Sequence, residues 1–544
     1  MLQGAKKKAK LWRPAVDPRG ATTHSSVHAS SAVEVIRSDA DADTTPAQGL
    51  RDWFSDVAKT AFDGLREHID SDRWLQHATA AHIELAKSRY AVRDEVGWKQ
   101  GEPLRLLLAG YNGTRNTGAD VRVEEMIRQF RHLFGDDHVD LSVFTLDPKL
   151  TRGYFRTVKQ LHLPKVFPKF LFDEIADQHG VIACEGSMFK SKFANALCSM
   201  MVGSLGIATA EQKIAVGYGG EAGEMDAPMK RFVAKHASDA YVICRNRASQ
   251  DVLRELGIRS EFGTDTAWTF DPGPRDIGAK ILREHGWNGT TPVMAICPIN
   301  AFWWPVKPDV KRAMTLPFTD MHKEMHYGSV YFHADDRELQ EKQDSYIKAL
   351  ASAVSRIETE RDVFTVLIGS EQLDRRACEA LNAELGNTRP VIVSDEHDMY
   401  EMVSVMRNAS VMLSSRYHAI VMSMAAGVRS AGVTMDERIR NLMEERDQPD
   451  LCATVDDANL AERAYQMLNT LFDEPVRVKE GIDRCVMANL ERFGRMGMLL
   501  VDHVKTFYPE FPFATDLGTD GDPWRHLPPM RGDVAELVNR MRPS

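Results

Sequence analysis

Short apolar runs that alternate with helix-like segments repeat twice along this 544-residue chain, and this pattern constrains the fold more than any other feature. The runs are rich in Val, Ile and Leu and cover residues 104–109, 139–144, 181–184, 213–217 and 240–244, then 293–297, 363–368, 391–393 and 411–413. Apolar runs of this length, separated by helices, are typical of parallel strands that are buried on both faces. The sequence therefore predicts an α/β protein with two parallel sheets.

Two such halves predict two Rossmann-like domains that face each other across a cleft. We expect an N-terminal domain over residues 101–270, a C-terminal domain over 290–475, and a C-terminal helix and tail over 476–544. Residues 1–49 have the polar composition of a disordered tail, whereas 50–100 repeat apolar residues at helical spacing and predict a helical extension. Ligands of open α/β sheets bind at the carboxyl ends of the strands, so the cleft is the expected site.

Composition narrows the class of protein. With 68 Lys plus Arg and 78 Asp plus Glu the net charge is −10, which argues against nucleic-acid binding. The seven cysteines are scattered singly, so we expect reduced thiols in a cytoplasmic protein. The longest apolar stretch, residues 193–210, is interrupted by polar residues and predicts a buried helix rather than a membrane span. The basic N-terminus is followed by no apolar segment of the kind found in a secretory signal.

The loop over residues 110–120 joins the first predicted strand to a helix. Its three glycines let the backbone approach a ligand, and Asn116 and Asp120 offer polar groups where the helix begins. A tight turn in which the Asp only caps the helix explains the same residues, and the sequence leaves both interpretations open. The loop lacks the Lys-Ser/Thr pair of a P-loop, and the Gly-rich segment 217–223 does not favour a dinucleotide cofactor.

The strongest local signal is Ser414–His418, between a strand and an apolar helix. Ser415, Arg416 and His418 gather hydrogen-bond donors and positive charge at a helix N-terminus, which predicts an anion site. Cations are unfavourable there unless an anion is present, which favours this hypothesis over a surface turn. Arg245 and Arg438 follow other apolar runs and could add guanidinium groups that suit carboxylate or phosphate.

Two further features are weaker. Trp303 and Trp304 follow the first strand of the second half and could stack on a sugar, or staple a loop to the domain. His322 and His326 stand at helical spacing near His333, but solvated histidines explain this pattern better than a metal site, so we predict no metal.

From about residue 104 to 445 the sequence resembles the polysaccharide pyruvyl transferase family. No single motif is decisive; their order and spacing carry the resemblance, with departures at Glu185, Asn246 and Arg429 and an extra residue before Asp120. The matching segments are Asn116–Asp120, Cys184–Ser187, Arg245–Ser249, Asp265, Arg416–Ala419 and Gly427–Arg429.

The resemblance implies a fold similar to the two-domain GT-B glycosyltransferases and transfer of a pyruvyl group from phosphoenolpyruvate to two hydroxyls of a sugar or glycan, forming a cyclic ketal. It implies that Arg416 and His418, with Arg245, hold the donor, and that Arg438 stands where the family has a Lys. The implied acceptor site lies near Asn116, Asp120 and Glu185 of the opposing domain, with Asp265, Trp303 and Trp304 as further candidates.

A chemical scheme follows from these assignments. His418 delivers a proton to C3 of the donor, and a carboxylate, Asp120 or Glu185, accepts a proton from a sugar hydroxyl. The scheme requires no metal or cofactor. Two alternatives stay open: a GT-B glycosyltransferase that uses a nucleotide sugar, and a non-catalytic carbohydrate-binding protein. The sequence leaves the oligomeric state open, a homo-oligomer included.

Overall fold

The computed structural model describes residues 71–92, 97–315, 326–328, 331–334, 336–518 and 520–542. The expected disordered tail over residues 1–49 and the first part of the expected helical extension lie outside this range. The extension is represented by helix α2 (Ser71–Val92), which packs on α4 and α5 of the first domain. Residues 70–544 form one compact unit.

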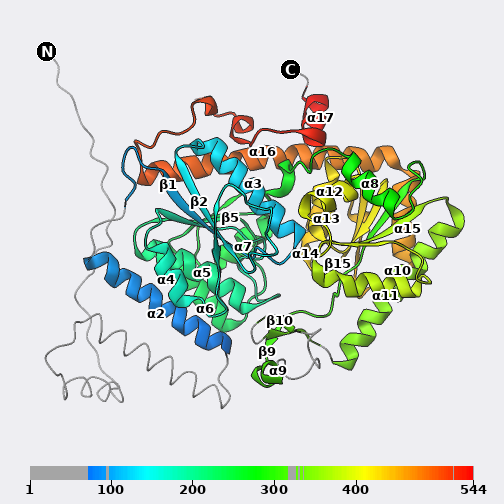
Figure 1. Cartoon of the computed structure of the whole chain (residues 1–544), viewed down its shortest axis with the longest axis horizontal. Helices are drawn as coiled ribbons and strands as arrows, with labels where there is room; N and C mark the ends of the chain where they lie inside the picture. Colours follow the sequence, from blue (N-terminus) through cyan, green and yellow to red (C-terminus); the bar gives the residue numbers. More distant parts are fainter. Residues whose placement is uncertain are drawn as a thin grey trace. The chain divides into compact units, whose positions relative to one another are not determined.

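The first sheet has seven strands in the order β3-β2-β1-β4-β5-β6-β7, and all its pairings are parallel. Its strands are β1 (Leu104–Ala109), β2 (Val139–Thr145), β3 (Lys159–His162), β4 (Gly180–Ala183), β5 (Ile214–Gly220), β6 (Tyr241–Cys244) and β7 (Ser260–Phe262). Its helices are α3 (Thr117–Phe134), α4 (Pro168–Ile175), α5 (Asn195–Ala210), α6 (Ala227–His236) and α7 (Arg247–Glu255). The central strands β1, β4 and β5 are buried almost throughout because helices cover both faces (Figure 1).

The second sheet has six parallel strands in the order β13-β12-β8-β14-β15-β16. These are β8 (Val293–Cys297), β12 (Phe364–Gly369), β13 (Val391–Val393), β14 (Val411–Ser414), β15 (Arg429–Thr434) and β16 (Cys452–Thr454). The accompanying helices are α8 (Asp276–Glu284), α10 (Arg337–Glu360), α11 (Arg375–Glu384), α12 (Met399–Arg407), α13 (Tyr417–Met424), α14 (Glu437–Glu445) and α15 (Leu460–Asp473). The predicted pair of Rossmann-like domains in a GT-B-like fold is confirmed, whereas the exact domain limits stay predictions.

A small antiparallel sheet interrupts the second domain between β8 and α10. It is formed by β9 (Lys307–Pro308), β10 (His326–Gly328) and β11 (Tyr331–Phe332), with α9 (Val310–Thr315) beside it. The hydroxyl of Tyr331 donates to Asp72 of α2 at 2.5 Å, so the insertion is attached to the first domain. The alternation of apolar runs did not predict this sheet, because its strands are only two or three residues long.

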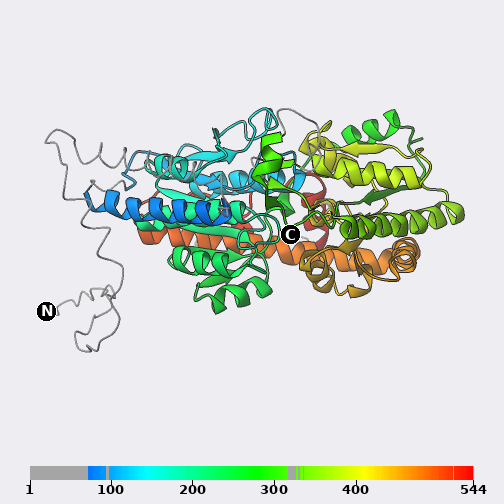
Figure 2. The ribbon, with the colours of Figure 1, turned by 90° about the horizontal axis from the view of Figure 1, so that it is seen from below.

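The expected C-terminal helix is α16 (Pro475–Phe507), which crosses from the second domain back to the first (Figures 1 and 2). It packs on β15, α13 and α15 of the second domain and on α3 of the first. Helix α17 (Gly532–Met541) follows and contacts it. Within the described ranges, no helix combines the length and the apolar character needed to cross a membrane.

Candidate active site

The carboxyl ends of β1 and β14 are followed by the first turns of α3 and α13, and these two turns meet. Asn116 caps α3 by accepting a hydrogen bond from the Ala119 amide at 3.2 Å, and the Thr117 amide donates to the Ser370 carbonyl of the second domain at 2.9 Å. A Cβ atom built on Gly118 would lie 2.3 Å from Nδ1 of His418. Only a glycine allows the imidazole to approach helix α3 this closely.

His418 also contacts a buried carboxylate of the first domain. Its Nε2 atom lies 3.2 Å from Oδ2 of Asp265, which is fully buried. The same oxygen lies 3.1 Å from Nε of Arg122 and 3.1 Å from Nη1 of Arg245. Arg122 is itself fully buried, and its two Nη atoms donate to the carbonyls of Cys184 and Gly219 at 2.9 Å. Asp265 thus holds together three cationic or potentially cationic side chains from both domains.

The pKa values in this group follow from burial and charge. Burial opposes ionisation of Asp265, but Arg122, His418 and Arg245 outweigh it and hold the pKa of this carboxyl well below its usual range. Burial lowers the pKa of His418, against the opposing effect of Asp265, so the imidazole is neutral at pH 7. A neutral imidazole beside a carboxylate carries its proton on the nitrogen that faces the carboxylate, which is Nε2, and Nδ1 keeps its lone pair.

A chain of buried ion pairs extends from Arg245 to the second domain. Nη2 of Arg245 donates to Oε2 of Glu221 at 2.6 Å, and the same oxygen accepts from Nζ of Lys190 at 2.6 Å. Lys190 also lies 2.5 Å from Oε1 of Glu437 in the second domain. Arg438 pairs with Asp436 at 2.7 Å. Every arginine that the sequence proposed for donor binding on these loops is therefore already paired with a carboxylate of the protein.

The same is true of Arg416. Its Nη2 atom lies 2.8 Å from Oε2 of Glu371, and its guanidinium also binds both oxygens of Asp374. Burial raises the pKa of Glu371 and of Asp374, although Arg416 acts in the opposite direction. The hydroxyl of Ser415 is also paired within the protein, because it lies 2.8 Å from the Tyr346 hydroxyl in the core.

Asp120 and Glu185 are the predicted carboxylates of the first domain. Asp120 is 1% exposed; its Oδ1 accepts a weak hydrogen bond from the Gly113 amide at 3.4 Å, and its Oδ2 has no hydrogen-bond partner in the described part of the chain. Burial raises the pKa of Asp120 to about 7. Glu185 accepts from its neighbour, the Gly186 amide, at 2.7 Å, and lies 3.9 Å from Nη1 of Arg122.

A cavity of about 440 Å³ opens at the carboxyl ends of β15 and β16. Lys192 of the first domain lines it together with Trp304, Asp436, Glu437 and Arg440 of the second. Trp304 lines this cavity, whereas Trp303 lines a separate cavity of about 200 Å³ and packs beside His333. The roles of both tryptophans stay predictions.

Sequence reasoning missed the carboxylates that pair with Arg245 and Arg416, namely Glu221, Glu371 and Asp374. It also missed two further cations, Arg122 and Lys190, which pair with Asp265 and Glu221. A usable signal existed for two of the carboxylates, because Glu221 directly follows strand β5 and Glu371 follows β12 by two residues. His322, which the sequence analysis weighed as a metal ligand and set aside, lies outside the described residues. Among the described residues, no group of three or more His, Cys, Asp or Glu side chains could hold a metal ion.

Comparison with known proteins adds the following. No curated protein sequence matches the chain. Among solved structures it is similar to UDP-GlcNAc 2-epimerase from Neisseria meningitidis, with 8% identity, a TM-score of 0.43 and coverage of 74% of this chain and 99% of that one. It is also similar to the spinosyn forosaminyltransferase, at 13% identity and a TM-score of 0.39 over 73% of this chain and 99% of that one. It is similar as well to the N-terminal domain of Candida albicans trehalose-6-phosphate phosphatase, with 10% identity, a TM-score of 0.44 and coverage of 76% of this chain and 99% of that one.

Residues 212–437 match the sequence model of the polysaccharide pyruvyl transferase family. The matched segment includes Arg245, Asp265, Arg416 and His418, which follow the carboxyl ends of β6, β7 and β14. Residues 212–437, less than half of the chain, are therefore similar to a polysaccharide pyruvyl transferase domain, which is a domain of enzymes.

Proposed function

We propose that the protein transfers the pyruvyl group of phosphoenolpyruvate to two hydroxyls of a sugar, forming a ketal and releasing inorganic phosphate. One observation carries the proposal: His418, inside the matched segment, contacts Asp265 and packs against Gly118, both of the first domain. A side chain held in this way can exchange a proton at a fixed place in the cleft.

The balance of the reaction defines what the residues must do. Two hydroxyl oxygens form bonds to C2 of the donor, and the bond between C2 and the phosphate oxygen breaks. Of the two hydroxyl protons, one ends on C3, which becomes a methyl group, and the other ends on the departing phosphate. The site therefore needs one group that gives a proton to C3 and one that takes a proton from a hydroxyl.

The pKa directions favour the reverse of the roles that the sequence suggested. Burial raises the pKa of Asp120 to about 7, so this carboxyl holds its proton closer to neutral pH than an ordinary aspartic acid and is the better proton donor to C3. His418 is neutral, with its pKa lowered by burial, and is the better base toward a hydroxyl. Asp265 positions the imidazole and stabilises the imidazolium that forms.

Donor binding involves Arg416 and Arg245 in this proposal. Each guanidinium already contacts a carboxylate, so the donor's negative charges must compete with Glu371 or Glu221. Competition is easier at Arg416, because Glu371 and Asp374 have raised pKa values and one of them can take up a proton. Neutralising a carboxylate leaves the guanidinium with positive charge to offer to phosphate.

The experiment measures phosphate release from phosphoenolpyruvate with a panel of sugars, together with thermal unfolding in the presence of each donor. Phosphoenolpyruvate at about 100 times its Kd should stabilise the protein by about 2.7 kcal/mol, seen as a higher Tm. His418→Ala should abolish turnover while leaving this stabilisation in place. Stabilisation by a nucleoside diphosphate instead, with no phosphate release, would identify a nucleotide-sugar glycosyltransferase and overturn the proposal.

A further inference from the structure

One edge of the first sheet concentrates positive charge in a chain whose net charge is −10. Between Asp147 and Asp173 the sequence contains no Asp or Glu. Clusters of about four to eight Lys and Arg residues attract anionic surfaces. Six exposed cations form such a cluster in this segment, here called the basic edge: Lys149, Arg152, Arg156, Lys159, Lys165 and Lys169.

The topology of the sheet gathers these side chains in one place. Strand β3 is the outermost strand, and the Leu163 amide that follows it donates to the Thr145 carbonyl at the end of β2 at 2.9 Å. The loops that follow β2 and β3 therefore leave the sheet side by side. The first of these loops carries Lys149 and Arg152, and the second carries Lys165. Positive charge from two neighbouring loops adds up at this edge.

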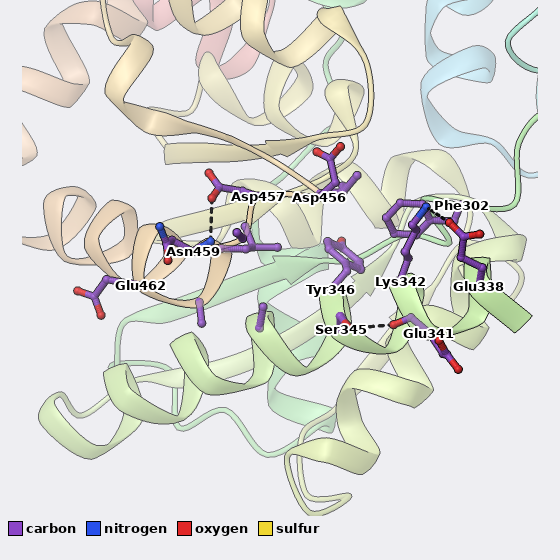
Figure 3. Close-up of a pocket in the computed structure, with 15 residues that line it drawn as sticks. Phe302, Glu338, Glu341, Lys342, Ser345, Tyr346, Asp456, Asp457, Asn459 and Glu462 are labelled. Carbon is purple, nitrogen blue, oxygen red and sulfur yellow. Dashed lines mark hydrogen bonds and ion pairs between the residues drawn. The ribbon is translucent and has the colours of Figure 1, made fainter.

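The protein itself leaves most of the basic edge unpaired. Of its six cations, only Lys169 forms an ion pair with a carboxylate of the described chain, that of Asp173. A cavity of about 650 Å³ in the second domain, between α10 and the loop from β16 to α15, shows the contrary arrangement. There the lining ammonium group of Lys342 pairs with Glu338 at 2.7 Å (Figure 3). Cations without such partners are available to an anion from outside the protein.

The negative charge of the rest of the chain does not prevent an anionic partner from binding here. Salt screens exposed charges that lie more than about 8 Å apart at physiological ionic strength. A partner at the basic edge is therefore affected mainly by the six cations close to it, and less by the carboxylates on other surfaces of the molecule.

The uncharged residues of the segment distinguish a lipid surface from a nucleic acid. Single-stranded nucleic acids are bound by stacking of their bases on exposed aromatic rings. The large apolar side chain that is exposed among the cations is instead aliphatic, because Val166 is 54% exposed beside Lys165. An aliphatic side chain next to lysines suits the boundary between headgroups and acyl chains. The aromatic rings of the segment pack within the protein, namely Tyr154, Phe155, Phe167, Phe170 and Phe172.

The basic edge lies beside the contact between the two Rossmann-like domains. Tyr154, which follows Arg152 in the same loop, accepts hydrogen bonds from the Met399 amide of the second domain at 2.7 Å and from Arg115 at 2.8 Å. A surface that binds the loop therefore lies close to the place where the domains meet.

We propose that the basic edge docks the protein on a bilayer that contains anionic lipids. The six cations contact the headgroup phosphates, and Val166 enters the boundary between headgroups and acyl chains. The association is peripheral, and salt weakens it because attraction between charges carries the contact.

The experiment measures cosedimentation of the full-length chain with vesicles of phosphatidylcholine alone and of phosphatidylcholine mixed with phosphatidylglycerol. We expect binding to the mixed vesicles only, and less binding as the salt concentration is raised. Reversing three cations that have no ion pair, with Lys149→Glu, Arg152→Glu and Lys165→Glu in one variant, should weaken this binding by about tenfold or more.

The matched control reverses three exposed lysines on α6 and α10, with Lys230→Glu, Lys235→Glu and Lys348→Glu in one variant. It changes the net charge by the same amount and should bind the mixed vesicles as the wild type does. All six positions are exposed, so both variants should keep the Tm of the wild type.

Three results would overturn the inference: no binding of the wild type to mixed vesicles, equal binding by the wild type and the basic-edge variant, or an equal loss in the control variant. Tighter binding to duplex DNA or single-stranded RNA than to mixed vesicles would overturn it as well. Vesicle binding that depends on the basic edge, without phosphate release from phosphoenolpyruvate, would contradict the proposed function alone.

Discussion

Asp120 is a buried carboxyl group at the start of α3, and burial raises its pKa to about 7. Its protonation state therefore changes in the pH range in which kcat/KM can be measured. If Asp120 gives a proton to C3, the active form is protonated, and kcat/KM falls tenfold per pH unit above about 7. His418 must be neutral in the same scheme, so kcat/KM also falls in acid, below its normal pKa of about 6.5. Asp120→Asn should lower kcat by about 10² to 10⁴ and remove the alkaline decline.

Stability provides the control for this variant. Burial raises the pKa of Asp120 in the folded state to about 7, whereas an unfolded aspartic acid has a pKa of about 3.9. The free energy of unfolding therefore decreases as the pH rises from about 3.9 to about 7. Above pH 7 the free energy of unfolding has lost the full contribution of Asp120 ionisation. Asp120→Asn should therefore be at least as stable as the wild type at pH 8 in urea unfolding. A pH profile in which kcat/KM rises through pH 7 would show that Asp120 acts as a base.

We expect Glu371 to affect the affinity for the donor rather than the rate of the chemical step. It shares Arg416 with Asp374, and two carboxylates on one guanidinium leave little positive charge for a ligand. Glu371→Gln should therefore tighten phosphoenolpyruvate binding by roughly tenfold, equivalent to about 1.4 kcal/mol, measured by titration calorimetry. Glu379→Gln removes a carboxylate from the same region and serves as the matched control. Unchanged or weaker binding in Glu371→Gln would remove Arg416 from the donor site.

At the scale of elements, the contact between α3 and α13 depends on Gly118, which has no side chain. A Cβ on Gly118 would overlap His418, so Gly118→Ala must separate the two helix starts or rotate the imidazole away from Asp265. Misplacement of a catalytic group by about 1 Å can cost about 10²-fold, and we expect a loss of this size in kcat. Gly97→Ala, where a Cβ meets nothing within 4 Å, is the control. Full activity in Gly118→Ala would show that the close approach has no catalytic role.

The strands that sequence reasoning found and missed differ in their apolar content, because even the short edge strand β13 was found where all of its residues are apolar. The runs 104–109, 293–297 and 391–393 coincide with β1, β8 and β13, because strands covered by helices must be apolar along their length. Strands β3, β7 and β16 were missed because each has only three or four residues and carries polar residues among them. Strand β15 was missed because Arg429-Ser430-Ala431-Gly432 contains few of the branched residues that mark a buried strand.

At the scale of the whole molecule, the sequence predicted which loops meet but not how their charges are balanced. Arg245, Arg416 and His418 were found because each follows an apolar run, and the carboxyl ends of parallel strands lie at one edge of a sheet. Their carboxylate partners come from other loops: Glu371 stands 45 residues before Arg416 in the chain, and Asp265 stands 153 residues before His418. Sequence spacing does not show pairings of this kind, because they form only in the folded protein. The loops that the sequence predicts as a positively charged anion site therefore contain internal ion pairs.

The two domains are joined by more than the chain, which predicts how the molecule unfolds. Helix α16 packs on both, His418 of the second domain contacts the buried Asp265 of the first, and the buried Lys190 pairs with the half-buried Glu437. Separating the domains would expose the packed face of α16 and break both polar contacts. We therefore expect both domains to lose their structure over the same urea range, although chains of this size often unfold in steps.

The cysteines allow this prediction to be measured domain by domain. All seven are buried: Cys184, Cys198 and Cys244 in the first domain, Cys297, Cys378 and Cys452 in the second, and Cys485 on α16. Burial raises the pKa of Cys198 and of Cys485 to about 12, so neither thiol reacts quickly in the native state. Labelling with a thiol reagent along a urea series, followed by peptide mass spectrometry, should give one midpoint for both sets. A lower midpoint for either domain would show that α16 and the ion pairs of the cleft do not couple the two halves.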